Sequence, residues 1–238
     1  GGKVTIVEKQ AFMGGNSAYA SSGINAAKNS SASPDDEDSA EKFALDTFKS
    51  SGVDSESSHP ANDLIPVLTS NSFDALRWAR ERVGVDLSKI GQLGGHSFAR
   101  TFRPATGMAG SELIFAISKI IKSFVKTKQV ELKMNTAAKD LLVDEESGKV
   151  IGVKVEGSSS NEKREESIYS NNVILATGGY ANDRTNSSIL QRFRPDLVKF
   201  ATTNGKFATG DGHKMTMRAG GNTVDMENVQ VHPTAFID

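Results

Sequence analysis

Glu8 directly follows the apolar run Val4–Val7, and this run predicts a buried strand. In a dinucleotide-binding βαβ unit, an acidic residue at the end of the second strand accepts hydrogen bonds from both ribose hydroxyls. The glycine-rich turn of such a unit would lie before residue 1. A surface carboxylate at a strand end therefore remains the simpler interpretation of Glu8 taken alone.

Small and polar residues follow this strand. The segments Gly14–Ser17 and Ser21–Asn25 carry little side-chain bulk and many backbone amides. Such segments are suited to line an extended cofactor that contains phosphates and an aromatic ring. They favour the nucleotide interpretation of Glu8.

Two later turns also allow the backbone to approach a ligand. Leu175–Gly179 follows an apolar run and includes Thr177 and Gly178, which also fits an ordinary tight turn. Thr209–Gly212 opens a predicted helix, where Asp211 would either cap the helix or accept hydrogen bonds from a ligand.

His232 precedes Pro233 and follows the strand-like residues 228–231. A protonated imidazole beside a rigid proline can hold a carboxylate through a charge-assisted hydrogen bond. A lone histidine is more commonly a structural residue, and the spacing leaves both interpretations open.

Three helical regions are expected to support these segments. The first covers about residues 38–49, and the second covers about 63–83 as one or two helices, with Ser72 as a candidate N-cap. The clearest helix begins at Ser111, because apolar residues recur there at i, i+3, i+4 and i+7. The side chains expected to turn inward are Leu76, Trp78 and Ala79 in the second helix, and Leu113, Ile114, Ile117, Ile120, Ile121, Phe124 and Val125 in the third.

Short strand patterns follow this helix at about 130–134, 138–143, 150–156 and 166–169. We interpret them as an antiparallel meander over about residues 130–170. The next run, Asn172–Ala176, predicts a continuous buried strand. Strands, an amphipathic helix and a meander together favour an α/β fold with a small antiparallel layer.

The composition excludes several classes of function. Lys and Arg total 28 against 29 Asp and Glu, and this balance argues against nucleic acid as a partner. No run approaches the roughly 18 apolar residues of a membrane span. The lack of cysteine excludes disulfides and thiolate ligands, and four scattered histidines do not favour a metal site, so no metal is expected.

Several short motifs follow one another along the chain. They are Val7-Glu8-Lys9, Gly14-Gly15-Asn16-Ser17, Ser21-Ser22-Gly23-Ile24-Asn25, Leu93-Gly94-Gly95-His96-Ser97 with Arg100 and Arg103, Ala176-Thr177-Gly178-Gly179, Thr203-Asn204-Gly205, Thr209-Gly210-Asp211-Gly212 and Gln230-Val231-His232-Pro233-Thr234. The chain thus resembles, over essentially all 238 residues, the eukaryotic-type members of the fumarate reductase/succinate dehydrogenase flavoprotein superfamily. This resemblance implies a Rossmann-like FAD-binding domain over residues 1–238, truncated at both ends, with a substrate-capping region starting near 232–238.

The resemblance also implies roles for individual residues. Glu8 would hold the adenosine ribose, the Ala138 backbone would face the adenine, and Asp211 would contact the flavin cofactor. His232 and Gly23 would contact a small dicarboxylate substrate, fumarate or succinate. The residues expected to line the rest of the cofactor are Asn16, Ser17, Ser21, Ser22 and Gly23, together with the turn residues Thr177 and Gly178. No role follows for Gly94, Gly95, His96, Arg100 and Arg103.

The activity implied is reduction of fumarate to succinate by hydride transfer from N5 of reduced FAD. Asn16 stands where membrane-bound succinate dehydrogenases carry a histidine joined covalently to the flavin, so non-covalent FAD is expected. The proton-donating arginine would lie downstream, which leaves no catalytic residue in this chain and makes a non-catalytic folded fragment the alternative.

Urocanate reductase and L-aspartate oxidase remain alternatives as sister activities. A soluble protein of the cytoplasm or an organelle is expected, and the sequence does not indicate the electron donor.

Overall fold

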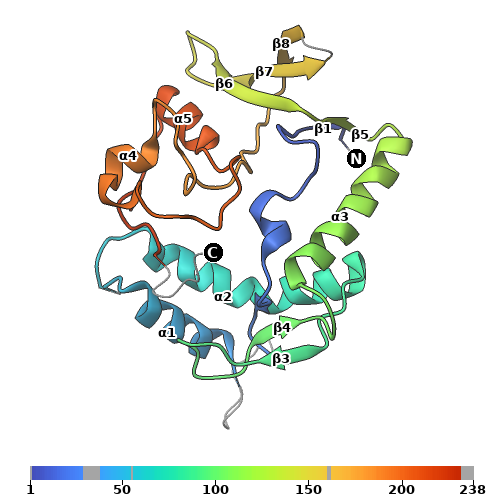
Figure 1. The fold of residues 1–238 in the computed structure, drawn as a ribbon. Helices are drawn as coiled ribbons and strands as arrows, with labels where there is room; N and C mark the ends of the chain where they lie inside the picture. Colours follow the sequence, from blue (N-terminus) through green and yellow to red (C-terminus); the bar gives the residue numbers. More distant parts are fainter. Residues whose placement is uncertain (1, 29–37, 55, 160–161, 232–238) are drawn as a thin grey trace. The chain divides into compact units, whose positions relative to one another are not determined.

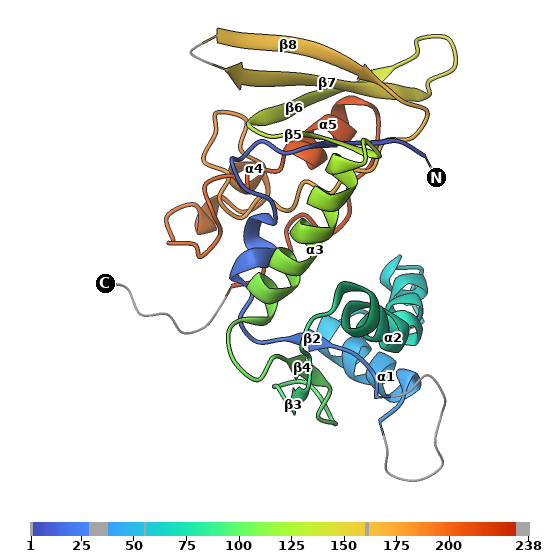
Figure 2. The same ribbon diagram turned by 90° about the vertical axis from the view of Figure 1, so that its right-hand side faces the viewer.

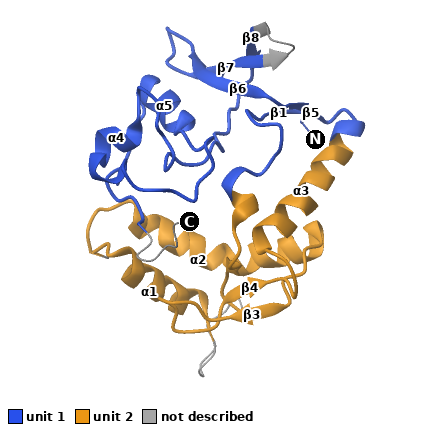
Figure 3. Cartoon of the chain, viewed as in Figure 1, with its two compact units in different colours: residues 1–16, 125–238 blue, residues 17–124 orange. Residues whose placement is uncertain are grey.

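The computed structural model describes residues 2–28, 38–54, 56–159 and 162–231, and Figure 1 shows the path of the chain. The chain divides into two compact units, which Figure 3 colours separately. Unit 1 comprises residues 1–16 and 125–238, and unit 2 comprises residues 17–124. No helix within the described ranges is both long and apolar enough to cross a membrane.

Unit 1 begins with a parallel pair of strands. β1 (Val4–Val7) pairs with β5 (Val130–Lys133) along its whole length. The pairing continues one step further, because the Glu8 N–H donates to the Lys133 carbonyl at 2.9 Å. The predicted first strand is therefore confirmed, and Glu8 lies directly after its carboxyl end. The expected burial of this strand is wrong, because none of its residues is buried and Val4 is 52% exposed.

An antiparallel meander forms a separate sheet of unit 1 (Figure 2). Its strands pair in sequence order and are β6 (Thr136–Val143), β7 (Val150–Ser159) and β8 (Glu162–Tyr169). The predicted meander over 130–170 is confirmed for these strands, but its expected first strand is β5, which pairs with β1 instead. The chain changes direction at Asn135, whose φ of 52° is left-handed and whose N–H donates to the Gln10 carbonyl at 3.1 Å.

The rest of unit 1 carries short helices, α4 (Ile189–Phe193), the 3₁₀ turn η3 (Pro195–Leu197) and α5 (Asp211–Arg218). The predicted helix after Thr209 is thus confirmed. Its N-cap is Gly210, with a φ of 68°, so Asp211 is the first residue of α5 and does not cap it.

The strand predicted at Asn172–Ala176 does not form. These residues pair with no strand in the described part of the chain, and Ile174 is 90% exposed. An apolar run becomes a buried strand only where neighbouring strands satisfy its backbone groups and cover its side chains. Residues 228–231 likewise form no strand.

The helices of unit 2 are α1 (Ala40–Ser51), α2 (Ala61–Trp78) with a following π-helical turn η2 (Ala79–Val83), and α3 (Ala109–Lys126), whose last two residues belong to unit 1. The 3₁₀ turn η1 (Gly15–Tyr19) spans the other boundary between the units. The N-cap of α1 is Ser39, whose hydroxyl accepts the Lys42 N–H at 3.3 Å. The N-cap predicted at Ser72 is wrong, because this residue lies in the middle of α2. Its buried hydroxyl donates to the Thr69 carbonyl and accepts the Ala27 N–H.

A small antiparallel sheet completes unit 2. Its order is β2 (Ile24–Asn25), β4 (Thr101–Arg103) and β3 (Lys89–Gly91). β4 is the central strand, so it connects the segment around Gly23 to the loop that precedes residue 101.

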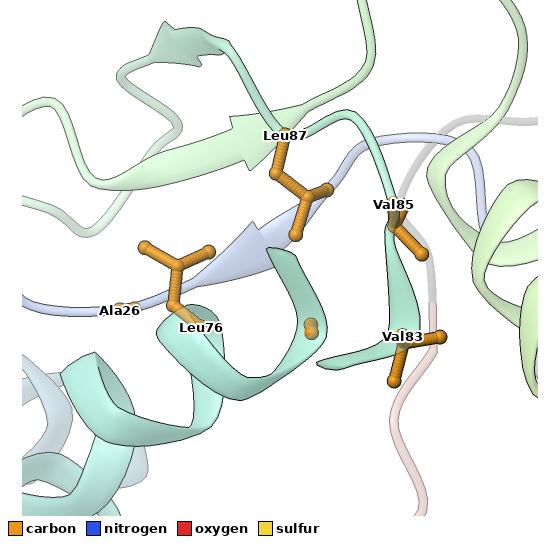
Figure 4. Close-up of a cluster of buried hydrophobic side chains, with 6 residues drawn as sticks. Ala26, Leu76, Val83, Val85 and Leu87 are labelled. Atoms are coloured by element: carbon orange, nitrogen blue, oxygen red, sulfur yellow. The ribbon is translucent and has the colours of Figure 1, made fainter. Parts of the chain in front are cut away.

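The apolar core of unit 2 forms where α2 and η2 meet β2 and the chain leading to β3 (Figure 4). Its buried members are Ala26, Leu76, Ala79, Val83, Val85 and Leu87, and Leu113, Ile117 and Ile120 of α3 pack against them. The inward positions predicted for Leu76 and Ala79 are confirmed. Those predicted for Trp78, Phe124 and Val125 are wrong, because these side chains are 53%, 43% and 37% exposed.

Candidate cofactor-binding site

The protein forms a hydrogen bond to one of the two carboxylate oxygens of Glu8. Glu8 Oε1 accepts the Gln10 N–H at 2.8 Å, and the Glu8 backbone carbonyl accepts the Thr136 N–H at 2.9 Å. Oε2 has no hydrogen-bond partner among the described residues. A carboxylate with one oxygen anchored and the other free can accept ribose hydroxyl protons, as a nucleotide site requires at this place.

Asp211 lies close to the same strand end. Lys9 Nζ donates to Asp211 Oδ2 at 2.6 Å and to Thr209 Oγ1 at 2.8 Å, and the Thr209 hydroxyl donates to Asp211 Oδ1 at 2.7 Å. The side chains of Lys9 and Asp211 are 25% and 30% exposed. Sequence reasoning assigned no role to Lys9, although it lies in the Val7-Glu8-Lys9 motif. The structure shows that it ties the end of β1 to the start of α5.

Asn16 uses its side chain to hold a distant loop of unit 1. Its Nδ2 donates to Asn204 Oδ1 at 2.6 Å, and its Oδ1 accepts the Gly205 N–H at 2.9 Å. The Asn182 side chain donates to the Asn204 carbonyl and completes this loop contact. Asn16 therefore braces the Thr203-Asn204-Gly205 motif, and the second proton of its Nδ2 is left to donate to a ligand.

The turn at Thr177 and Gly178 packs against the start of α5. Thr177 Oγ1 accepts the Gly212 N–H at 3.1 Å, and a side chain at Gly212 would place its Cβ 2.1 Å from that oxygen. Gly178 has a φ of 72°, which favours glycine. A cavity of about 400 Å³ lies beside this turn, and His213 lines it. Its Nδ1 is buried without a partner among the described residues.

Ala138 lies at an irregularity in β6. The pairing with β7 shifts register between Ala138 and Asp140, so Lys139 is the extra residue of a β-bulge. Arg218 of α5 donates to the Lys139 carbonyl at 2.6 Å and to the Asp140 carboxylate at 3.2 Å. The backbone expected to face an adenine is thus an interrupted stretch of strand, anchored to α5.

In unit 2, the three serines predicted to line the cofactor share one property. The residues Ser17, Ser21 and Ser22 are exposed, and none of their hydroxyls has a hydrogen-bond partner in the described part of the chain. The segment is fixed by its backbone, because the Gly110 N–H donates to the Ala20 carbonyl at 2.8 Å. A Cβ at Gly110 would lie 2.0 Å from the Ser17 carbonyl oxygen, so only glycine permits this contact with α3.

Gly23 is held tightly against β4. Its φ is 140°, and an added Cβ would lie 2.5 Å from the Phe102 carbonyl oxygen. A cavity of about 340 Å³ opens beside it, lined by Ser22, Gln92, Thr101 and Arg103 among others. Arg103 is exposed and forms no ion pair with a described carboxylate.

The residues without an assigned role lie together in unit 2. Arg100 is completely buried and pairs with Asp38 and Asp46, and His96 lies beside it. Gly95 has a φ of 82°, and a Cβ added there would lie 3.0 Å from Ser50 Oγ. A Cβ added at Gly94 would meet no atom within 4 Å. His232 lies outside the described residues, as does the expected start of the capping region at 232–238.

The described side chains form no cluster of three or more His, Asp or Glu residues that could hold a metal ion. Unit 1 instead offers the strand-end carboxylate of Glu8 and the backbone turn at Gly178, and unit 2 offers the unpaired hydroxyls of Ser17, Ser21 and Ser22. These groups fit a ligand with several hydroxyl and phosphate groups.

Comparison with known proteins agrees with this chemistry. The sequence pattern of a family described as "FAD binding domain" matches residues 1–238. The fumarate reductase of Schizosaccharomyces pombe is 36% identical over 241 residues, covering 100% of this chain and 46% of the relative. Fumarate reductase 1 of Saccharomyces cerevisiae is 34% identical, covering 99% of this chain and 48% of the relative. The chain therefore spans about half the length of these curated relatives.

Among solved structures, the open conformation of a flavocytochrome c3 fumarate reductase matches with a TM-score of 0.74 and 28% identity. The match covers 90% of this chain and 35% of that chain. Sister activities also occur among the relatives, since a urocanate reductase of Eggerthella lenta and an L-aspartate oxidase of Bacillus subtilis are each 31% identical. The mixed α/β fold with an antiparallel meander is thus confirmed as that of an FAD-binding domain.

Proposed function

Because this chain belongs to the FAD-binding domain family, we propose that it holds non-covalent FAD in an oxidoreductase that reduces fumarate to succinate. The observation that carries this proposal is the 36% identity to a fumarate reductase over the whole chain. When bound, FAD supplies the hydride that such a reduction requires. The protein's part is to bind, orient and polarise.

The described residues of each unit supply groups that suit parts of a flavin nucleotide. In unit 1, the free Oε2 of Glu8 is available to the ribose hydroxyls, and the turn at Gly178 allows close backbone approach. In unit 2, the exposed hydroxyls of Ser17, Ser21 and Ser22 are available as donors to phosphate and carbonyl oxygens. Asn16, Ala138, Thr177 and Asp211 complete the proposed cofactor contacts.

The non-covalent attachment is supported by Asn16. An amide side chain lacks the nucleophilic nitrogen that joins a histidine to a flavin, and both polar groups of Asn16 already bond within the protein. Acid precipitation of the FAD-loaded enzyme tests this point. We expect all of the flavin in the supernatant, and flavin that stays with the precipitate would contradict the proposal.

For the substrate, we propose that His232 donates a charge-assisted hydrogen bond to one carboxylate and that Gly23 lies against the substrate. The close contact between Gly23 and the Phe102 carbonyl oxygen supports this role, because it leaves no room for a side chain at residue 23. A His232→Ala enzyme is expected to lose about 2–4 kcal/mol of transition-state stabilisation, measured as kcat/KM for fumarate.

The relatives favour two further candidate substrates, urocanate and L-aspartate. Steady-state assays of the enzyme with each acid separate them. We expect the highest kcat/KM with fumarate; a higher value with urocanate, or peroxide release with aspartate, would assign the enzyme to a sister activity. Turnover of fumarate by the 238-residue chain alone would exclude the alternative of a non-catalytic fragment.

A further inference from the structure

We propose that Arg100 is a positioning residue that fixes the cofactor-lining segment 21–25 through a buried network of charges. This inference rests on the proposed binding of FAD. It assigns a role to the Gly94-Gly95-His96-Ser97 loop and to Arg100, for which the sequence motif indicates none.

All residues of this network belong to unit 2. The side chains of Arg100 and Asp38 are each 0% exposed. Arg100 Nε donates to both carboxylate oxygens of Asp38 at 3.1 and 3.2 Å, while Nη1 donates to Asp46. His96 Nδ1 lies 3.2 Å from Nη1, and because a guanidinium only donates, this nitrogen must accept. Phe43 also contacts the guanidinium, with its ring centroid 4.8 Å from Cζ.

The charges in this network are stabilised despite their burial. Burial opposes the charge of Arg100, but hydrogen bonds and charge from Asp38 and Asp46 outweigh it and raise the pKa of the guanidinium. Burial likewise acts to raise the pKa of Asp46, yet bonds from Ser97 and Arg100 lower it. Ser97 contributes both its N–H at 2.7 Å and its hydroxyl at 2.6 Å. A planar fork with five donors satisfies two carboxylates at once, which a lysine ammonium cannot reproduce.

The backbone of Arg100 leads directly to the proposed cofactor segment. Its carbonyl accepts the Ala26 N–H at 3.0 Å, and the next residue, Thr101, donates from its hydroxyl to Asn25 Oδ1 at 2.7 Å. Phe102 pairs with Ile24 in the β2–β4 ladder. A Cβ added at Gly23 would lie 2.5 Å from the Phe102 carbonyl oxygen. A displacement of β4 therefore displaces Gly23, and with it Ser21 and Ser22.

The residues that lead into the Gly94–Ser97 loop form one wall of the cavity beside Ser22. Gln92 Nε2 donates to the His96 carbonyl at 2.7 Å, and Gln92 and Leu93 line that cavity. Gly95 lets the loop pass the end of α1, because its φ is 82° and a Cβ would lie 3.0 Å from Ser50 Oγ. The network thus controls two sides of the cavity, the β4 side and the loop side.

The test compares FAD binding with folding in the FAD-loaded enzyme. Arg100→Lys keeps the charge but loses the fork, and we expect the dissociation constant for FAD to rise roughly tenfold or more with a shifted visible flavin spectrum. Asp46→Asn should act in the same direction. Arg77→Met is the matched control, because Arg77 belongs to an exposed pair with Asp74 at 2.9 Å; FAD binding should not change.

Thr101→Val keeps Arg100 and its carboxylates and removes only the bond to Asn25, so it remains informative if the Arg100 variants do not fold. It is also expected to weaken FAD binding and shift the flavin spectrum. Folded variants at either position with unchanged FAD affinity and spectrum, whatever their melting temperature, would show that the network only stabilises unit 2. If the enzyme without any substitution binds no FAD, the proposed function itself is refuted.

Discussion

Gly23→Ala tests whether the segment proposed to contact flavin and substrate is fixed by its backbone. The φ of 140° is strained for alanine, and the added Cβ would lie 2.5 Å from the Phe102 carbonyl oxygen and 2.9 Å from Thr101 Cγ2. A strained backbone conformation costs about 1–3 kcal/mol, and overpacking of a well-packed site costs a similar amount. Since the nearest atom belongs to the backbone of the central strand β4, relief by side-chain rotation is not available. We expect the free energy of unfolding to fall by about 2–6 kcal/mol.

Urea denaturation followed by circular dichroism measures this change. Gly91→Ala is the matched control, because it lies in β3 of the same sheet and its Cβ would meet no atom within 4 Å. The control is expected to change stability by no more than about 1 kcal/mol in either direction. Equal stability of Gly23→Ala and Gly91→Ala would refute the argument that β4 excludes a side chain at residue 23.

Three further substitutions test other parts of the structure. Leu87→Ala should cost about 2–5 kcal/mol of unfolding free energy, because the side chain is 1% exposed in the core of unit 2; a loss under about 1 kcal/mol in urea denaturation would contradict that placement. Asp183→Asn should cost about 3–5 kcal/mol at neutral pH, since the buried carboxylate bonds Lys214 at 2.9 Å. Lys9→Met should cost about 1–2 kcal/mol, because it removes a partly exposed pair with Asp211.

The Asp183 variant also carries a pH signature. Burial acts to raise the pKa of Asp183, but hydrogen bonds from Thr185, Lys214 and the Ile189 N–H outweigh it and lower the pKa. A carboxyl with a lowered pKa contributes stability above its unfolded value of about 3.9 and loses it as the pH falls through the folded value. Asp183→Asn should therefore flatten the acid limb of the stability curve below about pH 4. An unchanged acid limb would contradict this.

Lys139→Met is the control for Lys9, since Lys139 pairs with Glu156 at 3.1 Å but is 46% exposed. Its effect should stay below about 1 kcal/mol. Equal losses for the two lysines would show that the link between β1 and α5 has no special weight.

The sequence predicted those elements whose signal is local. The helix at α3 follows from its own apolar spacing, and the core positions of Leu113, Ile117 and Ile120 agree with it. Pairing partners are not local, so nothing in the pattern of residues 130–133 could show that this strand joins β1 and leaves the meander. Likewise, Ser72 has the residue type of an N-cap, but its hydroxyl is used inside α2 to bond Ala27.

The site shows the same division. Glu8 is predicted at a strand end and lies there. Most glycines of the motifs stand where the backbone is left-handed or closely approached, but Gly94 and Gly179 do neither. The partners of charged residues were not predictable, because Lys9 meets Asp211 across 202 positions and Arg100 meets Asp38 across 62. Such contacts depend on how elements pack, and no periodicity in the sequence records them.

Anaerobic reoxidation of the reduced flavin tests the central claim most directly. The FAD-loaded enzyme would be reduced with dithionite, freed of excess reductant, and mixed with a stoichiometric amount of fumarate while flavin absorbance is followed. We expect the oxidised flavin spectrum to return in full, with succinate formed in equal amount. A flavin that stays reduced with fumarate but is reoxidised by oxygen would contradict the proposal that this family member reduces fumarate.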